Sequence, residues 1–165
     1  MQVIGIDPGT AITGYGIIRE DVSGNLVVVD YGVIQTPAKN PLPHRLVQLY
    51  QEMKKILLLH RSDSAAVEKL FFQKNVRTAL NVGQGRGVAI LALAEAGLQI
   101  SEYSPLEVKQ SVVGYGNADK RQVQQMVRTL LNLDDIPRPD DAADALAVAI
   151  CHIHSNRMQS LIDSM

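Results

Sequence analysis

The sequence contains very few cysteine and aromatic residues: one Cys, no Trp and two Phe among 165 residues. The single Cys151 excludes an internal disulfide, and we expect a cytoplasmic protein with reduced thiols. No apolar run is long and charge-free enough to span a membrane, and we expect no signal peptide because the chain begins directly with a strand. Disulfide-rich secreted domains and membrane proteins are thereby excluded as classes. The chain length predicts a single domain with a proper core.

The net charge is only −1, which by itself does not indicate a nucleic-acid-binding protein. Its distribution is uneven, because residues 1–35 carry a net −3 and residues 129–165 a net −4, whereas residues 36–86 carry a net +6. Two interpretations stay open. The pattern is either surface charge scattered by chance or the separation of an acidic metal site from a basic nucleic-acid-binding face.

Apolar periodicity and turn residues predict an α/β domain with a mixed five-stranded sheet flanked by helices. The expected strands are residues 2–7, 13–19, 25–35, 64–68 and 99–103. The expected helices are residues about 42–60, 75–97, 105–112, 119–132 and 140–156. Turn residues at Ser23-Gly24-Asn25 join two β-branched runs, so the first three strands should form an antiparallel meander.

Acidic residues stand where two expected strands end and where the last expected helix begins. Asp7 and Glu68 each follow an apolar run, and Asp141 and Asp144 lie three apart on one helical face. Four acids in one place raise one another's pKa values and need cations to neutralise them. Carboxylate oxygens suit Mg²⁺, and two such ions can clamp both oxygens of a phosphodiester displacement.

Each acid also has a purely structural interpretation when it is taken alone. Asp7 could be a turn residue before Pro8-Gly9. Either Asp140 or Asp141 could be the N-cap of the last helix, whose dipole favours an acid at Asp144. The neighbouring Asp140 lies four residues before Asp144, which is also a same-face spacing. We interpret Asp140 as the N-cap of that helix, not as a site residue.

Several ordered motifs together resemble the RuvC family of Holliday junction resolvases, which have a ribonuclease H-like fold. The matching stretches run from Met1 to about His154: Gly5-Ile6-Asp7-Pro8-Gly9, the strand ending at Glu68, Val82 to Ala89, Val108-Lys109-Gln110 with Val112-Val113-Gly114, Asp119-Lys120, Met126-Val127-Arg128, and Asp141 to Ala147. The resemblance implies that the catalytic, metal-binding acids are Asp7, Glu68, Asp141 and Asp144.

The resemblance also implies an activity: a structure-specific DNA endonuclease that resolves Holliday junctions in recombination and repair. Hydrolysis would use two Mg²⁺ per subunit, with Mn²⁺ able to substitute, and would leave 5′-phosphate ends. The implied assembly is a homodimer that nicks two opposed strands symmetrically and works with the RuvA and RuvB branch-migration proteins. We expect one nuclease domain over residues 1–156 and a short tail over residues 157–165.

Further site residues depend mainly on the resemblance. It associates Lys109 and Lys120 with catalysis and DNA, and an aromatic residue at the position of Phe71 with junction engagement. An aromatic side chain can stack on an unpaired base, whereas we expect the adjacent Phe72 to be packed. The other expected DNA contacts are Lys69, Lys74, Arg77 and Arg121, although a solvated surface would look the same.

Two motifs remain outside this site. Gly83-Gln84-Gly85-Arg86-Gly87 resembles a phosphate loop, but it falls within a helical pattern, so we interpret it as a close packing contact, with a dimer interface as one option. His152-Ile153-His154 is interpreted as the end of the last helix, and the four His residues do not have metal-ligand spacing.

Three other functions are compatible with parts of the sequence. An ATPase of the actin, Hsp70 and sugar-kinase type opens with a similar strand and Asp-Gly turn, but it needs two such domains. A junction-binding protein without catalysis would not require all four acids. An RNA-processing nuclease of the same fold is the main alternative.

Overall fold

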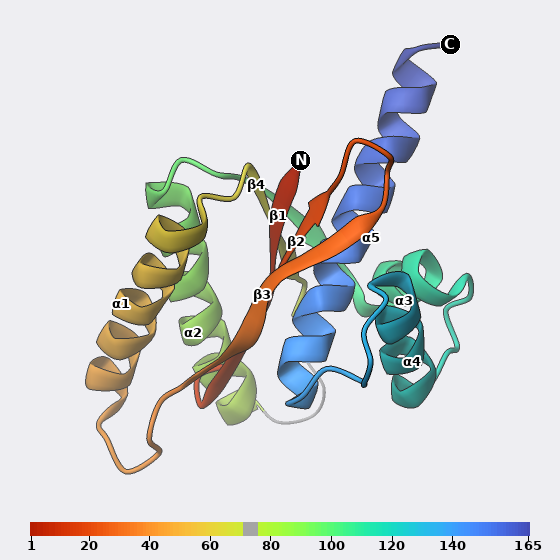
Figure 1. The fold of residues 1–165 in the computed structure, drawn as a ribbon. Helices are drawn as coiled ribbons and strands as arrows, with labels where there is room; N and C mark the ends of the chain where they lie inside the picture. Colours follow the sequence, from red (N-terminus) through yellow and green to blue (C-terminus); the bar gives the residue numbers. More distant parts are fainter. Residues whose placement is uncertain (71–75) are drawn as a thin grey trace.

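The computed structural model describes residues 1–70 and 76–165, which form a sheet with helices on both faces (Figure 1). The strands are β1 (Gln2–Asp7), β2 (Ile12–Glu20), β3 (Leu26–Gln35), β4 (Ser64–Glu68) and β5 (Gln99–Tyr103). The helices are α1 (Leu42–His60), α2 (Val76–Glu95), α3 (Pro105–Val113), α4 (Lys120–Leu130) and α5 (Asp140–Asp163). Every expected element is present, and most bounds agree within two residues.

The sheet has the order β3-β2-β1-β4-β5. Strands β1, β2 and β3 pair antiparallel, whereas β4 runs parallel to both β1 and β5. The expected mixed five-stranded sheet with an N-terminal meander is therefore confirmed. Because β1 and β4 are parallel neighbours at the centre of the sheet, their carboxyl ends lie at the same edge of the sheet.

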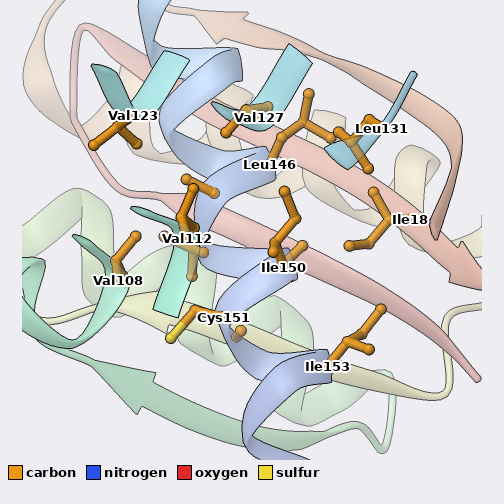
Figure 2. Close-up of a cluster of buried hydrophobic side chains, with 14 of the residues drawn as sticks. Ile18, Val108, Val112, Val123, Val127, Leu131, Leu146, Ile150, Cys151 and Ile153 are labelled. Carbon is orange, nitrogen blue, oxygen red and sulfur yellow. The ribbon is translucent and has the colours of Figure 1, made fainter. Parts of the chain in front are cut away.

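Alternation along the strands divides the interior into two cores, one on each face of the sheet. In β1, Ile4 and Ile6 face α1 and α2, whereas Val3 faces α5. The second core lies between the sheet and α3, α4 and α5, and Figure 2 shows its α5 residues Leu146, Ile150 and Ile153 among side chains from the neighbouring helices. Helix α5 is thus the element that joins the sheet to the α3–α4 layer.

Helix α5 lies unusually close to β1 and β2 because small residues meet at the contact. A Cβ atom on Gly5 would lie only 2.2 Å from the carbonyl oxygen of Ala145 and 2.9 Å from Cβ of Ala149. Glycine in the strand and alanine in the helix are therefore both required by this separation. The contact positions the N-terminal turn of α5 at the carboxyl end of β1.

The predicted end of the last helix was wrong. Helix α5 continues to Asp163, seven residues beyond the expected bound, because no Gly or Pro interrupts it. His152 is accordingly a buried side chain within α5, 3% exposed, with Nδ1 2.9 Å from the Tyr103 hydroxyl. Within the described ranges, no helix has the length and apolar character needed to cross a membrane.

Candidate active site

Asp7 and Glu68 are the last residues of two neighbouring parallel strands. Ile6 is in register with Val67, so the residue that follows each of them emerges at the same edge of the sheet. The two carboxyl groups lie close enough that each shifts the pKa of the other. The convergence expected from the sequence is therefore present in the structure, and it results from strand register.

The acids of α5 reach this edge because the helix begins directly over β2. Gly14, the cross-strand partner of Asp7, lies so close to the first turn of α5 that a Cβ atom on it would be 2.0 Å from the carbonyl oxygen of Asp141. Asp141 and Asp144 both act electrostatically on Asp7. The structure thus brings together all four acids that the sequence singled out.

Asp140 does not have the capping role that we expected. Pro139 occupies the N-cap position of α5, Asp140 is the first helical residue, and no side-chain capping bond is formed. The physical reason is that the Asp140 carboxylate has charged partners: its Oδ1 accepts from Nη1 of Arg138 at 2.6 Å, and its Oδ2 lies 3.5 Å from Nζ of Lys120. Ion pairing outside the helix replaces the capping bond.

Burial and mutual repulsion disfavour the charged forms of the acids. Burial, followed by the charges of Glu68, Asp144 and Asp141, raises the pKa of Asp7 to about 8. Burial is also the main reason that the pKa of Glu68 is raised, and the charge of Asp144 adds to it. The pKa of Asp144 is raised by burial although Lys120 opposes the shift. In the absence of cations Asp7 therefore favours its protonated form near neutral pH.

Two of the predicted lysines lie beside these acids. Nζ of Lys120 is 3.1 Å from Oδ2 of Asp144. The charges of Lys120 and Lys109 both act to lower the pKa of Glu68, against its overall rise. Lys120 is the first residue of α4 and Lys109 lies within α3, so the α3–α4 layer supplies the positive charge that faces the sheet edge.

The remaining residues that we predicted to contact DNA are spread over several elements. Lys69 follows Glu68 directly, and its Nζ is 3.9 Å from Oε2 of Glu107. Arg77 and Arg121 are exposed in the first turns of α2 and α4. Phe71, Phe72 and Lys74 lie outside the described residues, so their predicted roles stay predictions.

The turn that follows Asp7 is supported by residues that sequence reasoning missed. The Thr13 hydroxyl donates to the Gly9 carbonyl at 2.6 Å, and the Thr10 hydroxyl donates to the carbonyl of Asn81 in α2. A Cβ atom on Gly85 of α2 would lie 2.7 Å from the Gly9 oxygen. Gly85, the middle glycine of the motif, therefore makes the close packing contact, and its partner is the turn after Asp7. The glycine motif was the only feature of the sequence that indicated this contact.

The carboxylates at this edge of the sheet suit hard divalent cations, because they offer oxygen ligands, are partly buried and repel one another. In residues 1–70 and 76–165, no three Asp, Glu, His or Cys side chains are arranged to hold one ion between them. Mg²⁺ does not need such a cage, because it takes one or two carboxylates and completes its shell with waters and phosphate oxygens. The ammonium of Lys120, 3.1 Å from Asp144, places positive charge next to these carboxylates.

Comparisons with known proteins then decide the family. A family model described as "Crossover junction endodeoxyribonuclease RuvC" matches residues 3–152. The chain belongs to the RuvC family. A RuvC from Chloroflexus aurantiacus is 60% identical over 155 residues, which cover 94% of each chain.

Two solved structures of RuvC from Thermus thermophilus support the same assignment. One matches with a TM-score of 0.90 at 35% identity, covering 96% of this chain and 97% of the other. The second, a RuvC in complex with Holliday junction substrate, matches with a TM-score of 0.88 at 32% identity, covering 96% of each chain. The ribonuclease H-like fold and the family expected from the sequence are therefore confirmed.

Proposed function

We propose that this RuvC-family protein is a crossover junction endodeoxyribonuclease that resolves four-way DNA junctions by metal-dependent hydrolysis, in recombination and repair. The observation that carries the proposal is the convergence of Asp7 and Glu68, at the ends of paired parallel strands, with the acids of α5. The Thermus thermophilus relative in complex with Holliday junction substrate supports the choice of substrate.

Asp7, Glu68, Asp141 and Asp144 would hold two Mg²⁺ ions, for which Mn²⁺ would substitute. When bound, the ions supply positive charge that activates a water and stabilises the attacking and leaving oxygens. Asp7 is the most strongly perturbed acid of the cluster, so it has the most to gain from a nearby cation. Cleavage would leave 5′-phosphate and 3′-hydroxyl ends.

The lysines beside the carboxylates would act on the phosphate. Lys120 and Lys109 lie on the α3–α4 side of the site, where an ammonium can offset charge that develops on the scissile phosphate. Lys69, Arg77 and Arg121 would contact phosphates further along the DNA, together with Lys74. Phe71 would stack on a base at the junction.

We further propose a homodimer that uses the exposed face of α2. Val76, Leu80 and Leu91 are 84%, 61% and 59% exposed and lie on one stripe of the helix with Gly83 and Gly87. A Cβ atom on either glycine would meet nothing within 4 Å. Small residues between apolar ones allow two helices to approach closely, and a two-fold dimer matches symmetric nicking of a two-fold junction.

Three further assignments rest on the family. We propose that RuvA and RuvB are functional partners and that the protein acts in the cytoplasm, where bacterial DNA lies. We also propose a single nuclease domain over residues 1–156. Residues 157–163, which we assigned to a tail, continue helix α5.

One side-by-side assay tests the function. Wild type and Asp7→Asn would be incubated with a four-way DNA junction, a linear duplex of the same sequence and a structured RNA, each with Mg²⁺. We expect paired symmetric nicks in the junction alone, and none from the variant. Preferential cleavage of RNA would favour an RNA-processing nuclease, and junction binding without cleavage would indicate a protein that has lost catalysis.

A further inference from the structure

The first residues of α4 and α5 meet beside the carboxylate cluster, and one ammonium joins them. Nζ of Lys120 lies 3.1 Å from Oδ2 of Asp144 and 3.5 Å from Oδ2 of Asp140. Asp144 is one of the four proposed metal ligands, whereas Asp140 is outside that set. Lys120 therefore has one partner inside the site and one at its rim.

Stability does not explain why a lysine occupies this position. Lys120 is the first residue of α4, where the positive end of the helix dipole disfavours a cation. The start of α4 is already secured by a capping box between Asp119 and Gln122. The Lys120 side chain is 54% exposed, and ion pairs at such exposure add little to stability.

Asp140 also pairs with a second cation, Arg138. Its Oδ1 accepts a hydrogen bond from Nη1 of Arg138 at 2.6 Å, which leaves Oδ2 directed at Lys120. Because Asp140 makes no capping bond to its own helix, its carboxylate is free to serve both cations. A short chain of charges thus runs from Arg138 through Asp140 to Lys120 and ends at Asp144.

We propose that Asp140 is a positioning residue that retains the ammonium of Lys120 at the rim of the site when Asp144 is engaged by Mg²⁺. A carboxylate that coordinates a cation is a poor partner for a second one, so Lys120 loses its inner contact and keeps its outer one. The retained ammonium then faces the substrate phosphate. This inference rests on the proposed function and assigns a role that the metal ligands do not have.

A double-mutant cycle between Asp140 and Lys120 tests the proposal. The proteins are wild type, Asp140→Asn, Lys120→Met and the double variant. We expect Asp140→Asn to lower the single-turnover nicking rate at saturating junction and Mg²⁺ by roughly five- to tenfold when Lys120 is present, and by less than about twofold in the Lys120→Met background. Junction affinity should differ little between Asp140→Asn and wild type.

Calorimetric binding of Mg²⁺ to the free proteins gives a readout that does not depend on cleavage. In Asp140→Asn, Lys120 pairs with Asp144 alone and competes with the metal, so Mg²⁺ affinity should fall. Lys120→Met removes the competitor, so the affinity should rise, and the second substitution should then change it little. Melting temperatures would confirm that all four proteins are folded.

Asp134→Asn is the matched control, because it removes one exposed negative charge from the loop before α5. We expect wild-type nicking and Mg²⁺ binding from it. The inference is overturned if Asp140→Asn lowers the rate equally in both Lys120 backgrounds, or if Asp134→Asn has the same effect. A wild type that fails to nick junctions would instead contradict the proposed function, while the Mg²⁺ titrations would still report on the pairing of Lys120.

Discussion

Gly14 and the backbone of Asp141 are in such close contact that a Cβ atom on Gly14 would lie 2.0 Å from the Asp141 carbonyl oxygen. Gly14 is also the cross-strand partner of Asp7. The first turn of α5 therefore rests on the strand beside the first acid, and this contact sets how closely the acids of the helix approach those of the sheet.

Replacing Gly14 with alanine should push α5 away from the sheet. We expect Gly14→Ala to cost about 1–3 kcal/mol of unfolding free energy, as overpacking does, and to reduce nicking strongly. Urea unfolding and a junction-nicking assay would measure both effects. Gly32→Ala in β3 is the control, because the atoms nearest to its Cβ would belong to the Tyr15 side chain, at 3.0 to 3.2 Å, and a side chain can move more easily than backbone. Equal effects of the two substitutions would contradict the importance of the α5 contact.

Asp7→Asn should abolish cleavage while leaving four-way junction binding largely intact. The substitution removes a proposed metal ligand but no phosphate contact. Nicking assays with Mg²⁺ and fluorescence titrations of a labelled junction would separate the two effects. Near wild-type nicking by this variant would be incompatible with the proposed site.

The same variant should make the metal-free protein less sensitive to pH. Folding raises the pKa of Asp7 from 3.8 to about 8, so the folded state favours the protonated form. The contribution of Asp7 to stability is therefore fully present below pH 4 and is lost as the pH rises towards 8. In EDTA, Asp7→Asn should gain stability over wild type across this window, whereas Mg²⁺ should raise the melting temperature of wild type more than that of the variant. A gain that is constant with pH would contradict the shift.

Junction affinity should depend strongly on salt despite the net charge of −1. The residues to replace are Lys69, Lys74, Arg77, Lys109, Lys120 and Arg121, and each one removed should reduce the slope of log affinity against log salt by about one unit. Phe71→Ala is the contrasting variant: it should cost roughly 1–3 kcal/mol if a base stacks there and leave the slope unchanged. Titrations at several salt concentrations would show both. Affinity that is indifferent to salt would mean that these charges are only solvated surface.

Gly87→Ala should stabilise the monomer but weaken the proposed dimer. Alanine at this mid-helix position meets no neighbour, so α2 should gain about 0.5–1 kcal/mol. If two α2 helices cross at Gly83 and Gly87, the added methyl group separates them, and sedimentation velocity should show a larger monomer fraction. Leu59→Glu on α1, where Leu59 is 76% exposed, is the control and should leave the dimer unchanged. A dimer that is unaffected by Gly87→Ala would place the interface elsewhere.

Much of this protein was predictable because the informative signals are local. Short apolar runs in Gln2–Asp7 and Ser64–Glu68 and helical spacing in Leu42–His60 predicted those elements with the observed bounds. The positions of the acids at the ends of two strands and on one helical face indicated a shared site. The family resemblance selected Asp141 over Asp140, which the sequence pattern alone left open.

Tertiary structure decided the features that depend on distances between remote segments. Strand order placed β4 beside β1, and only that pairing makes Asp7 and Glu68 neighbours. The separation of α5 from the sheet explains why Gly14 has to be glycine, and no residue near it in sequence indicates this. The partners of Asp140 likewise come from α4 and from the loop before α5. Local sequence determines which element a residue joins, whereas packing of whole elements determines which charges meet.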